Sequence, residues 1–175
     1  MLIRPAEVGD LPALSELARK TYSESFGHSF TPSDLAFILN NEISYESLRE
    51  AMAEDIILVA MIAEGLVGFV QFGTASPTTP ALAPSDREIR RIYVKSDCQN
   101  RGIGRRLMAA ALDHPSLRLA ERIYIDVWER NPGAKRLYER FDFKVVGARE
   151  LAVESGARAD LDLIMVRHAR LPAPQ

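Results

Sequence analysis

The chain has 175 residues, of which 47% are hydrophobic and 26% are charged, and its formal net charge is −2. This length predicts one domain with a substantial buried core and is short for two domains, so we expect a single domain over residues 1–170 and a frayed tail over 171–175. The nearly neutral charge gives no reason to expect a nucleic-acid or anionic-membrane partner.

The N-terminal half predicts a strand, three helices and a hairpin. A short strand around Ile3 leads to Asp10, a predicted N-cap, and to a helix whose apolar residues recur at helical spacing: Leu11, Leu14, Leu17 and Ala18. A second helix begins at Thr31-Pro32, and a third runs from about Ser44 to Ala53. Residues 56–62 and 66–72 predict two strands joined by a turn at Glu64-Gly65.

The C-terminal half alternates strands and helices. A Pro-rich surface loop over residues 76–85 precedes a strand from Glu88 to Val94 and a helix from Ile103 to Leu112. A strand over 123–128 follows, then a helix with Pro132 at its first position, and two strands over 144–153 and 160–167. This order predicts an α/β or α+β fold, with a mixed sheet and helices on its faces.

Cysteine and histidine usage argues against disulfides and metal. Cys98 is the single cysteine, which excludes an intrachain disulfide and a zinc site made of thiolates, and suits a reducing cytoplasm. The three histidines are far apart in the sequence and show no metal-binding spacing. No signal-peptide segment and no apolar run near the roughly 18 residues of a membrane span are found, so we expect a cytoplasmic protein with no metal and no membrane partner.

The segment from Gln99 to Gly104 joins a predicted strand to a predicted helix. Gly102 and Gly104 allow close approach of the backbone to a ligand, and the N–H groups of a helix N-terminus favour an anion. Over residues 87–106, seven Lys and Arg residues are opposed only by Glu88 and Asp97. The segment therefore predicts either a phosphate-binding loop or an ordinary tight turn beside a solvated basic helix face. It is neither a full dinucleotide fingerprint nor a Walker A loop.

Two ordered motifs carry a family resemblance. Residues 88–94 followed by Gln99, Asn100, Arg101, Gly102, Ile103 and Gly104 resemble the acetyl-CoA signature of the GNAT superfamily of N-acetyltransferases. The second signature of that superfamily is matched by Asn131, Ala134, Tyr138 and Phe143, with Asp142 where the superfamily usually has glycine. The resemblance implies a central, mixed and mostly antiparallel twisted sheet of about seven strands, flanked by four or five helices. It also implies acetyl-CoA as the acetyl donor.

The resemblance assigns roles to the donor-site residues. It implies that the backbone of Ile92, Tyr93 and Val94 pairs with the pantetheine arm, while the loop from Gln99 to Gly104, with Arg105, holds the phosphates. Asn131 and Ala134 would contact the same arm, although Asn131 before Pro132 is also an ideal helix N-cap.

Two further residues are catalytic candidates. Tyr138 would protonate the departing thiolate, or it is a core aromatic; Leu137 and Phe141 look like better core residues. Glu88 is our candidate general base, directly or through water, and the alternative is a carboxylate paired with Arg90 or Arg87.

The acceptor is indicated by charge and by a second, closer resemblance. Residues 21–60 contain seven Asp and Glu residues and only one basic residue, Arg49. This negative charge suits a cationic amine, but it also fits the polar faces of amphipathic helices. Residues 21–26, 89–94, 127–131 and 162–165 resemble the bacterial PaiA-type polyamine N-acetyltransferases. A polyamine or similar small amine is therefore the expected acceptor. The alternatives are a protein N-terminus or lysine, or a non-catalytic acyl-CoA-binding domain, and the oligomeric state is left open, a homodimer included.

Overall fold

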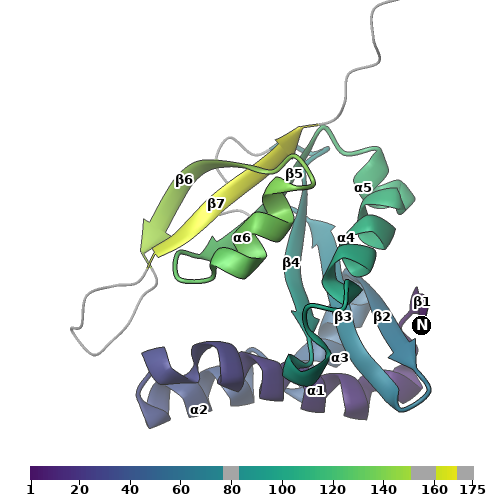
Figure 1. Ribbon diagram of the computed structural model, residues 1–175, viewed down its shortest axis with the longest axis vertical. Coiled ribbons are helices and arrows are strands. Elements are labelled where there is room, and N and C mark those ends of the chain that lie inside the picture. The colour runs from purple at the N-terminus through teal and green to yellow at the C-terminus, as the bar shows by residue number, and fades with distance from the viewer. Residues whose placement is uncertain (77–82, 151–160, 169–175) are drawn as a thin grey trace, which may run out of the picture. The chain divides into compact units, whose positions relative to one another are not determined.

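A computed structural model of the chain describes residues 1–76, 83–150 and 161–168 (Figure 1). The strands it contains are β1 (Leu2–Pro5), β2 (Ile56–Ile62), β3 (Gly65–Thr74), β4 (Arg87–Val94), β5 (Arg122–Trp128), β6 (Lys144–Glu150) and β7 (Leu161–His168). The helices are α1 (Leu11–Phe26), α2 (Pro32–Asn41), α3 (Tyr45–Glu54), α4 (Ile103–Asp113), α5 (Pro115–Arg118) and α6 (Pro132–Glu139). Three 3₁₀ turns complete them: η1 (Val8–Asp10), η2 (Gly27–Ser29) and η3 (Ser96–Cys98).

The strands follow the sheet order β1-β2-β3-β4-β5-β7-β6. The pairs β1–β2, β2–β3, β5–β7 and β6–β7 are antiparallel, and β4 pairs with β5 in parallel through Arg87–Ile89 and Ile123–Ile125. The predicted mixed and mostly antiparallel sheet of seven strands is thus confirmed. The helix α5 is a single turn that the sequence analysis did not predict.

The chain divides into two compact units. Unit 1 comprises Met1–Phe72 and Arg91–Ala111, and unit 2 comprises Gly73–Arg90 and Leu112–Gln175. The boundary crosses β3 and β4, so the end of β4 belongs to unit 1 and its beginning to unit 2. The predicted Pro-rich loop lies largely outside the described residues, as do the predicted tail and the end of the predicted strand over 144–153.

The core of unit 1 forms on α1. Its residues Leu11, Leu14, Leu17 and Ala18 are at most 2% exposed, as their helical spacing predicts. They pack in one cluster with Leu48 of α3 and with residues of β2 and β3 such as Phe69. The predicted hairpin is observed, but its turn is at Ala63-Glu64, one residue earlier than predicted. Gly65 is the first residue of β3 and adopts a φ of 116°, which glycine tolerates without steric cost.

We predicted that the Asp10 side chain caps α1, and this prediction is wrong. It occupies the N-cap position, but its side chain makes no capping hydrogen bond to the helix. Its two carboxylate oxygens instead accept hydrogen bonds from Arg4 Nη1 at 2.6 Å and Nη2 at 2.8 Å, and the Glu7 backbone N–H also donates to it at 2.8 Å. These hydrogen bonds, chiefly the one from Arg4, hold the pKa of the Asp10 carboxyl below its usual value.

Candidate active site

The loop after β4 has the backbone conformation that an anion site needs. Gln99 Nε2 donates to the Val94 carbonyl oxygen at 3.2 Å, which ties the loop back to the end of the strand. Asn100 and Gly102 adopt positive φ values of 59° and 77°, and α4 begins directly afterwards at Ile103. The first N–H groups of α4 have no acceptor within the helix, because the Gly102 carbonyl is first used by the Arg106 N–H, at 3.0 Å. These N–H groups are therefore available to bind phosphate oxygens.

Gly68 on β3 lies directly against the end of β4. A Cβ atom at this position would lie 2.7 Å from the Tyr93 carbonyl oxygen, 3.2 Å from Leu107 Cδ1 and 3.3 Å from Val94 Cγ2. A glycine is therefore required here for β3, the end of β4 and α4 to pack as closely as they do. The sequence analysis missed this residue, although a glycine inside a strand pattern is a recognised signal of close backbone approach.

The end of β4 is anchored on one side in the core of unit 1. The ring of Tyr93 meets that of Phe69 edge-on, with the centroids 5.4 Å apart, and packs against the same apolar cluster as α1. Ile92 and Val94 are half-buried. Unit 1 thus brings together the predicted strand residues Ile92, Tyr93 and Val94 and the predicted phosphate loop.

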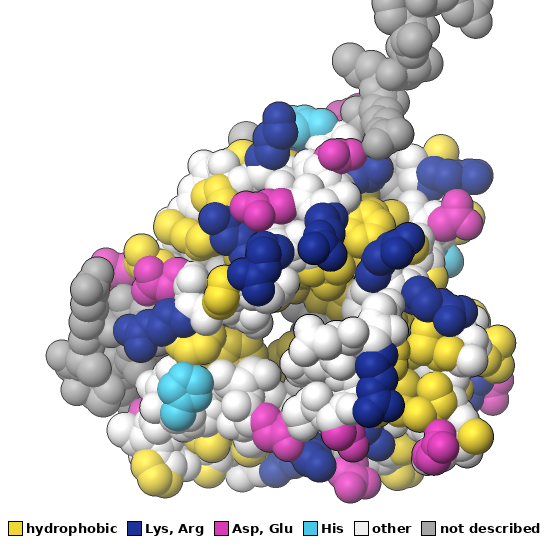
Figure 2. All heavy atoms as spheres, viewed as in Figure 1, with side chains coloured by type: hydrophobic (Ala, Val, Ile, Leu, Met, Phe, Trp, Pro, Cys, Tyr) yellow, Lys and Arg dark blue, Asp and Glu magenta, His cyan; other side chains and the backbone are white. Residues whose placement is uncertain are grey.

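Some of the basic residues between 87 and 106 bind backbone carbonyls, and others are exposed. Arg87, Arg90 and Arg91 all donate hydrogen bonds to backbone carbonyls of their own unit. Arg101 and Arg105, in contrast, are exposed, and exposed Lys and Arg side chains are a visible feature of the face shown in Figure 2. Arg106 is exposed as well, and its Nη2 donates to the Met1 carbonyl oxygen at 3.3 Å. These three arginines are therefore cations near the loop that a phosphate group can meet in solution.

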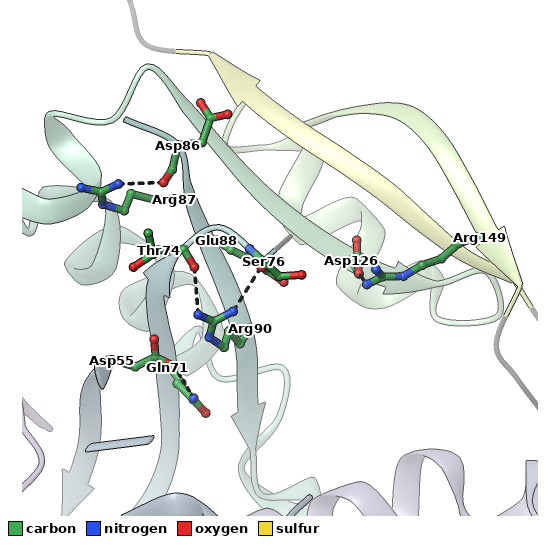
Figure 3. A network of polar contacts seen from close by, with 10 residues as sticks. All are labelled: Asp55, Gln71, Thr74, Ser76, Asp86, Arg87, Glu88, Arg90, Asp126 and Arg149. Atoms are coloured by element: carbon green, nitrogen blue, oxygen red, sulfur yellow. Dashed lines mark hydrogen bonds and ion pairs between the residues drawn. The ribbon is translucent and has the colours of Figure 1, made fainter. Parts of the chain in front are cut away.

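Glu88 lies in unit 2 within a polar network (Figure 3). Its Oε2 accepts a hydrogen bond from the Ser76 backbone N–H at 2.8 Å and forms an ion pair with Arg90 Nη1 at 3.2 Å. Arg90 Nη2 also donates to the Thr74 carbonyl at 2.8 Å. The alternative in which Glu88 pairs with Arg90 is therefore observed, and the carboxylate is held in a defined position.

The start of β4 is fixed by an ion pair that the sequence analysis did not predict. The Asp86 side chain is fully buried, and its two oxygens accept from Arg122 Nε at 3.0 Å and Nη2 at 2.8 Å. The Ala83 backbone N–H donates to the same carboxylate at 2.8 Å. Asp86 and Arg122 are 36 residues apart and follow no recognisable pattern, so only the fold reveals the pair.

Asn131 is the N-cap of α6, as predicted. Its Oδ1 accepts a hydrogen bond from the Ala134 backbone N–H at 3.0 Å, and Pro132 is the first residue of the helix. The motif residues Asn131 and Ala134 are thus joined by the cap itself. The cap fixes where α6 begins, and with it the position of Tyr138 nearly two turns later.

Tyr138 is more deeply buried than the sequence analysis expected. It is 5% exposed and packs near Phe143, with ring centroids 6.3 Å apart, whereas Leu137 and Phe141 are only half-buried. The expectation that Leu137 and Phe141 are better core residues than Tyr138 is therefore wrong. The cause is the turn at Asp142, whose φ of 67° folds Phe143 back so that its N–H donates to the Tyr138 carbonyl at 3.2 Å.

The predicted site residues divide between the two units. Ile92–Val94, the loop from Gln99 to Gly104 and Arg105 belong to unit 1, and Glu88, Asn131, Ala134 and Tyr138 belong to unit 2. Each group is locally ordered by its own hydrogen bonds.

Cys98 does not have the character of a reactive cysteine. Cys98 is buried, and its burial is the main cause that raises the pKa of its thiol, which is the opposite of what a reactive cysteine shows. Within residues 1–76, 83–150 and 161–168, no group of three or more His, Cys, Asp or Glu side chains is arranged to hold a metal ion. In the same ranges, no helix combines the length and the apolar character needed to cross a membrane.

Comparison with known proteins identifies the family. Residues 11–143 match the sequence profile of the Acetyltransferase (GNAT) family. An uncharacterized N-acetyltransferase from the pepI 3' region of Lactobacillus delbrueckii subsp. lactis is 26% identical over 131 residues, which cover 74% of this chain and 76% of that protein. The spermine/spermidine N(1)-acetyltransferase of Bacillus subtilis (strain 168) is 28% identical over 118 residues, which cover 63% of this chain and 78% of that protein.

A solved structure shows the same fold. The PaiA N-acetyltransferase from Thermoplasma acidophilum, in complex with coenzyme A, superimposes with a TM-score of 0.74 at 20% identity and covers 95% of this chain and 98% of that one. The family profile spans most of the chain, and the strand order and the helix after β4 agree with it. The chain therefore belongs to the GNAT family of acetyltransferases, as an N-acetyltransferase that uses acetyl-CoA as its cosubstrate.

Proposed function

We propose that this chain transfers the acetyl group of acetyl-CoA to a polyamine or another small cationic amine. The observation that carries the proposal is its 28% identity to the spermine/spermidine N(1)-acetyltransferase of Bacillus subtilis over 118 residues. The acidic residues of the N-terminal half support it. Glu42, Glu46, Glu50 and Glu54 are all exposed, at intervals of four residues, along α3 and the residues that precede it. Such a row of carboxylates attracts a polycation.

The donor site in this proposal is the end of β4 and the loop that follows. The N–H groups at the start of α4, together with Arg101 and Arg105, bind the phosphates of the coenzyme. The backbone of Ile92, Tyr93 and Val94 pairs with the pantetheine arm like an added strand. N–H groups of the same strand polarise the thioester carbonyl, which stabilises the oxyanion as the amine attacks.

The chemical step removes two protons from the acceptor nitrogen and supplies one proton to the departing sulfur. Glu88, through a water molecule, takes a proton from the acceptor ammonium, because only the neutral amine is a nucleophile. The nitrogen then attacks the thioester carbon, the C–S bond breaks, and the nitrogen releases its second proton to solvent water as the amide forms. Tyr138 gives its phenolic proton to the departing thiolate. The ion pair with Arg90 and the hydrogen bond from the Ser76 N–H hold this carboxylate in a fixed position.

An acceptor panel tests this function. Purified protein is incubated with acetyl-CoA and, in turn, spermidine, spermine, free lysine and a peptide with a free N-terminus, and the released thiol is measured. We expect thiol release with spermidine and spermine and little with the peptide. Turnover with the peptide alone would replace the polyamine by a protein acceptor. If no thiol is released with any amine although coenzyme A binds, the chain is a non-catalytic acyl-CoA-binding domain. A cytoplasmic location, suited to both substrates, stays a prediction.

A further inference from the structure

A series of hydrogen bonds in unit 1 joins β3 and β4 to the C-terminal ends of α2 and α3. Arg91 on β4 donates from Nη1 to Gln71 Oε1 at 3.2 Å and from Nη2 to the Glu42 carbonyl oxygen at 2.9 Å. Gln71 on β3 in turn donates from Nε2 to Asp55 Oδ2 at 2.6 Å (Figure 3). We call these residues, Asp55, Gln71, Arg91 and the Glu42 carbonyl, the β3–β4 polar chain.

Gln71 is the central residue of the polar chain, and its amide can bind in one orientation only. A guanidinium is solely a donor and an ionised carboxylate solely an acceptor, so the residue between them must accept on one side and donate on the other. Gln71 is 2% exposed in a strand that is otherwise apolar, so its amide cannot turn to water for a replacement partner. Breaking either hydrogen bond would therefore destabilise the fold of this region.

The hydrogen bond from Arg91 to the Glu42 carbonyl joins two functionally different elements. Arg91 directly precedes Ile92, the first of the strand residues that we place against the pantetheine arm. Glu42 is the C-cap of α2, where the last carbonyls of the helix lack partners within it and carry partial negative charge. The next residue, Ile43, is 1% exposed and anchors the turn between α2 and α3 in the core.

We propose that Gln71 and Arg91 are positioning residues that fix the α2–α3 turn relative to the end of β4. Through this contact they set how the acidic helices present the acceptor amine to the strand that holds the thioester. The inference rests on the proposed function for the identity of the acceptor, but the mechanical link between Glu42 and β4 does not depend on it.

An exchange of donor and acceptor between two residues of the β3–β4 polar chain tests the proposal. The variant Gln71→Glu keeps an acceptor for Arg91 but sets a second carboxylate against Asp55. The double variant Gln71→Glu with Asp55→Asn restores the missing bond in the reverse direction, and its net charge equals that of the wild type. The control variant Asn40→Asp adds the same negative charge to the end of α2 and keeps an acceptor for Arg19, which donates to Asn40 Oδ1 at 3.4 Å.

The readouts are the steady-state constants for spermidine and for acetyl-CoA, measured at about pH 8 so that the carboxylates are ionised. For Gln71→Glu we expect the KM for spermidine to rise roughly tenfold, while the KM for acetyl-CoA stays within about twofold. The double variant should return the spermidine KM to near the wild-type value, and Asn40→Asp should not raise it. An unchanged spermidine KM in Gln71→Glu would overturn the proposal, and so would an equal rise of both constants that the double variant does not reverse.

Hydrogen exchange separates this inference from the identity of the acceptor. In the wild type the Glu42 and Ile43 N–H groups donate to the Ile38 carbonyl, at 2.8 and 3.1 Å. If the polar chain holds this turn, these two amides exchange faster in Gln71→Glu and at the wild-type rate in the double variant. Equal exchange in all variants would refute the link. A wild type inactive on spermidine would instead refute the proposed acceptor, with the exchange result still deciding the link.

Discussion

The substitution Gly68→Ala places a methyl group where the structure has no room for one. The added Cβ would lie 2.7 Å from the Tyr93 carbonyl oxygen, well inside the roughly 3.5 Å at which carbon and oxygen atoms pack. A backbone carbonyl in the sheet cannot swing away as a side chain can, so β3 and the end of β4 must separate by several tenths of an ångström. Overpacking of this kind costs about 1–3 kcal/mol of unfolding free energy.

The same displacement should weaken coenzyme binding. If Ile92, Tyr93 and Val94 pair with the pantetheine arm, their displacement lowers the affinity for coenzyme A by roughly ten- to hundredfold. Urea unfolding measures the first effect, and calorimetric titration with coenzyme A measures the second.

Gly147→Ala supplies the matched control for this experiment. Gly147 also lies on a strand, but a Cβ there would meet only Ile164 Cδ1, at 3.9 Å, which is an ordinary contact. We expect the Gly147→Ala protein to have the same unfolding free energy and the same affinity for coenzyme A as the wild type. A Gly68→Ala protein that matched the control in both measurements would refute the inferred close approach. A loss of stability with unchanged coenzyme affinity would instead remove the end of β4 from the donor site.

Three further predictions concern separate residues. Tyr138→Phe keeps the packed ring but removes the proton donor, so kcat should fall by roughly 10²–10⁴-fold while coenzyme A binding is kept; an unchanged kcat would leave Tyr138 with packing alone. Asn131→Ala removes the cap of α6 and should cost about 1 kcal/mol in urea unfolding, most of which Asn131→Ser should restore. The pKa of Asp10 is lowered in the folded state, so its stabilisation is present above the unfolded-state value of about 4 and is lost as the pH falls through the lower folded-state pKa. The unfolding free energy of Asp10→Asn should therefore fall less on acidification than that of the wild type. Parallel pH profiles of the unfolding free energy in the two proteins would contradict this.

Local rules in the sequence were sufficient where the interaction is local. The cap at Asn131 connects residues three apart, and the apolar positions of α1 repeat with the period of the helix, so both could be read directly. Asp10 shows where such a rule fails. Its type and position satisfy the rule for an N-cap, but Arg4 offers a stronger, bidentate partner, and the carboxylate turns to it.

Contacts between distant segments could not be predicted in this way. The burial of Tyr138 depends on a turn at Asp142 that returns Phe143 to its ring, and no helical spacing encodes that turn. The bonds of Gln71 join three elements, and its position in an apolar strand shows only that something polar must meet it. The local geometry of the motif residues was therefore predictable from the sequence, whereas the packing that holds them had to be seen in three dimensions.

The turn at Asp142 also bears on how members of this family are found. A left-handed backbone conformation is most often supplied by glycine, but a short polar side chain also tolerates it, and Asp142 holds it here with a φ of 67°. A search pattern that insists on the letter G at this place would discard the chain, although its backbone follows the expected course. In this chain the position is defined by its torsion angle and not by glycine, so a signature written in torsion angles would include the chain where one written in letters would not.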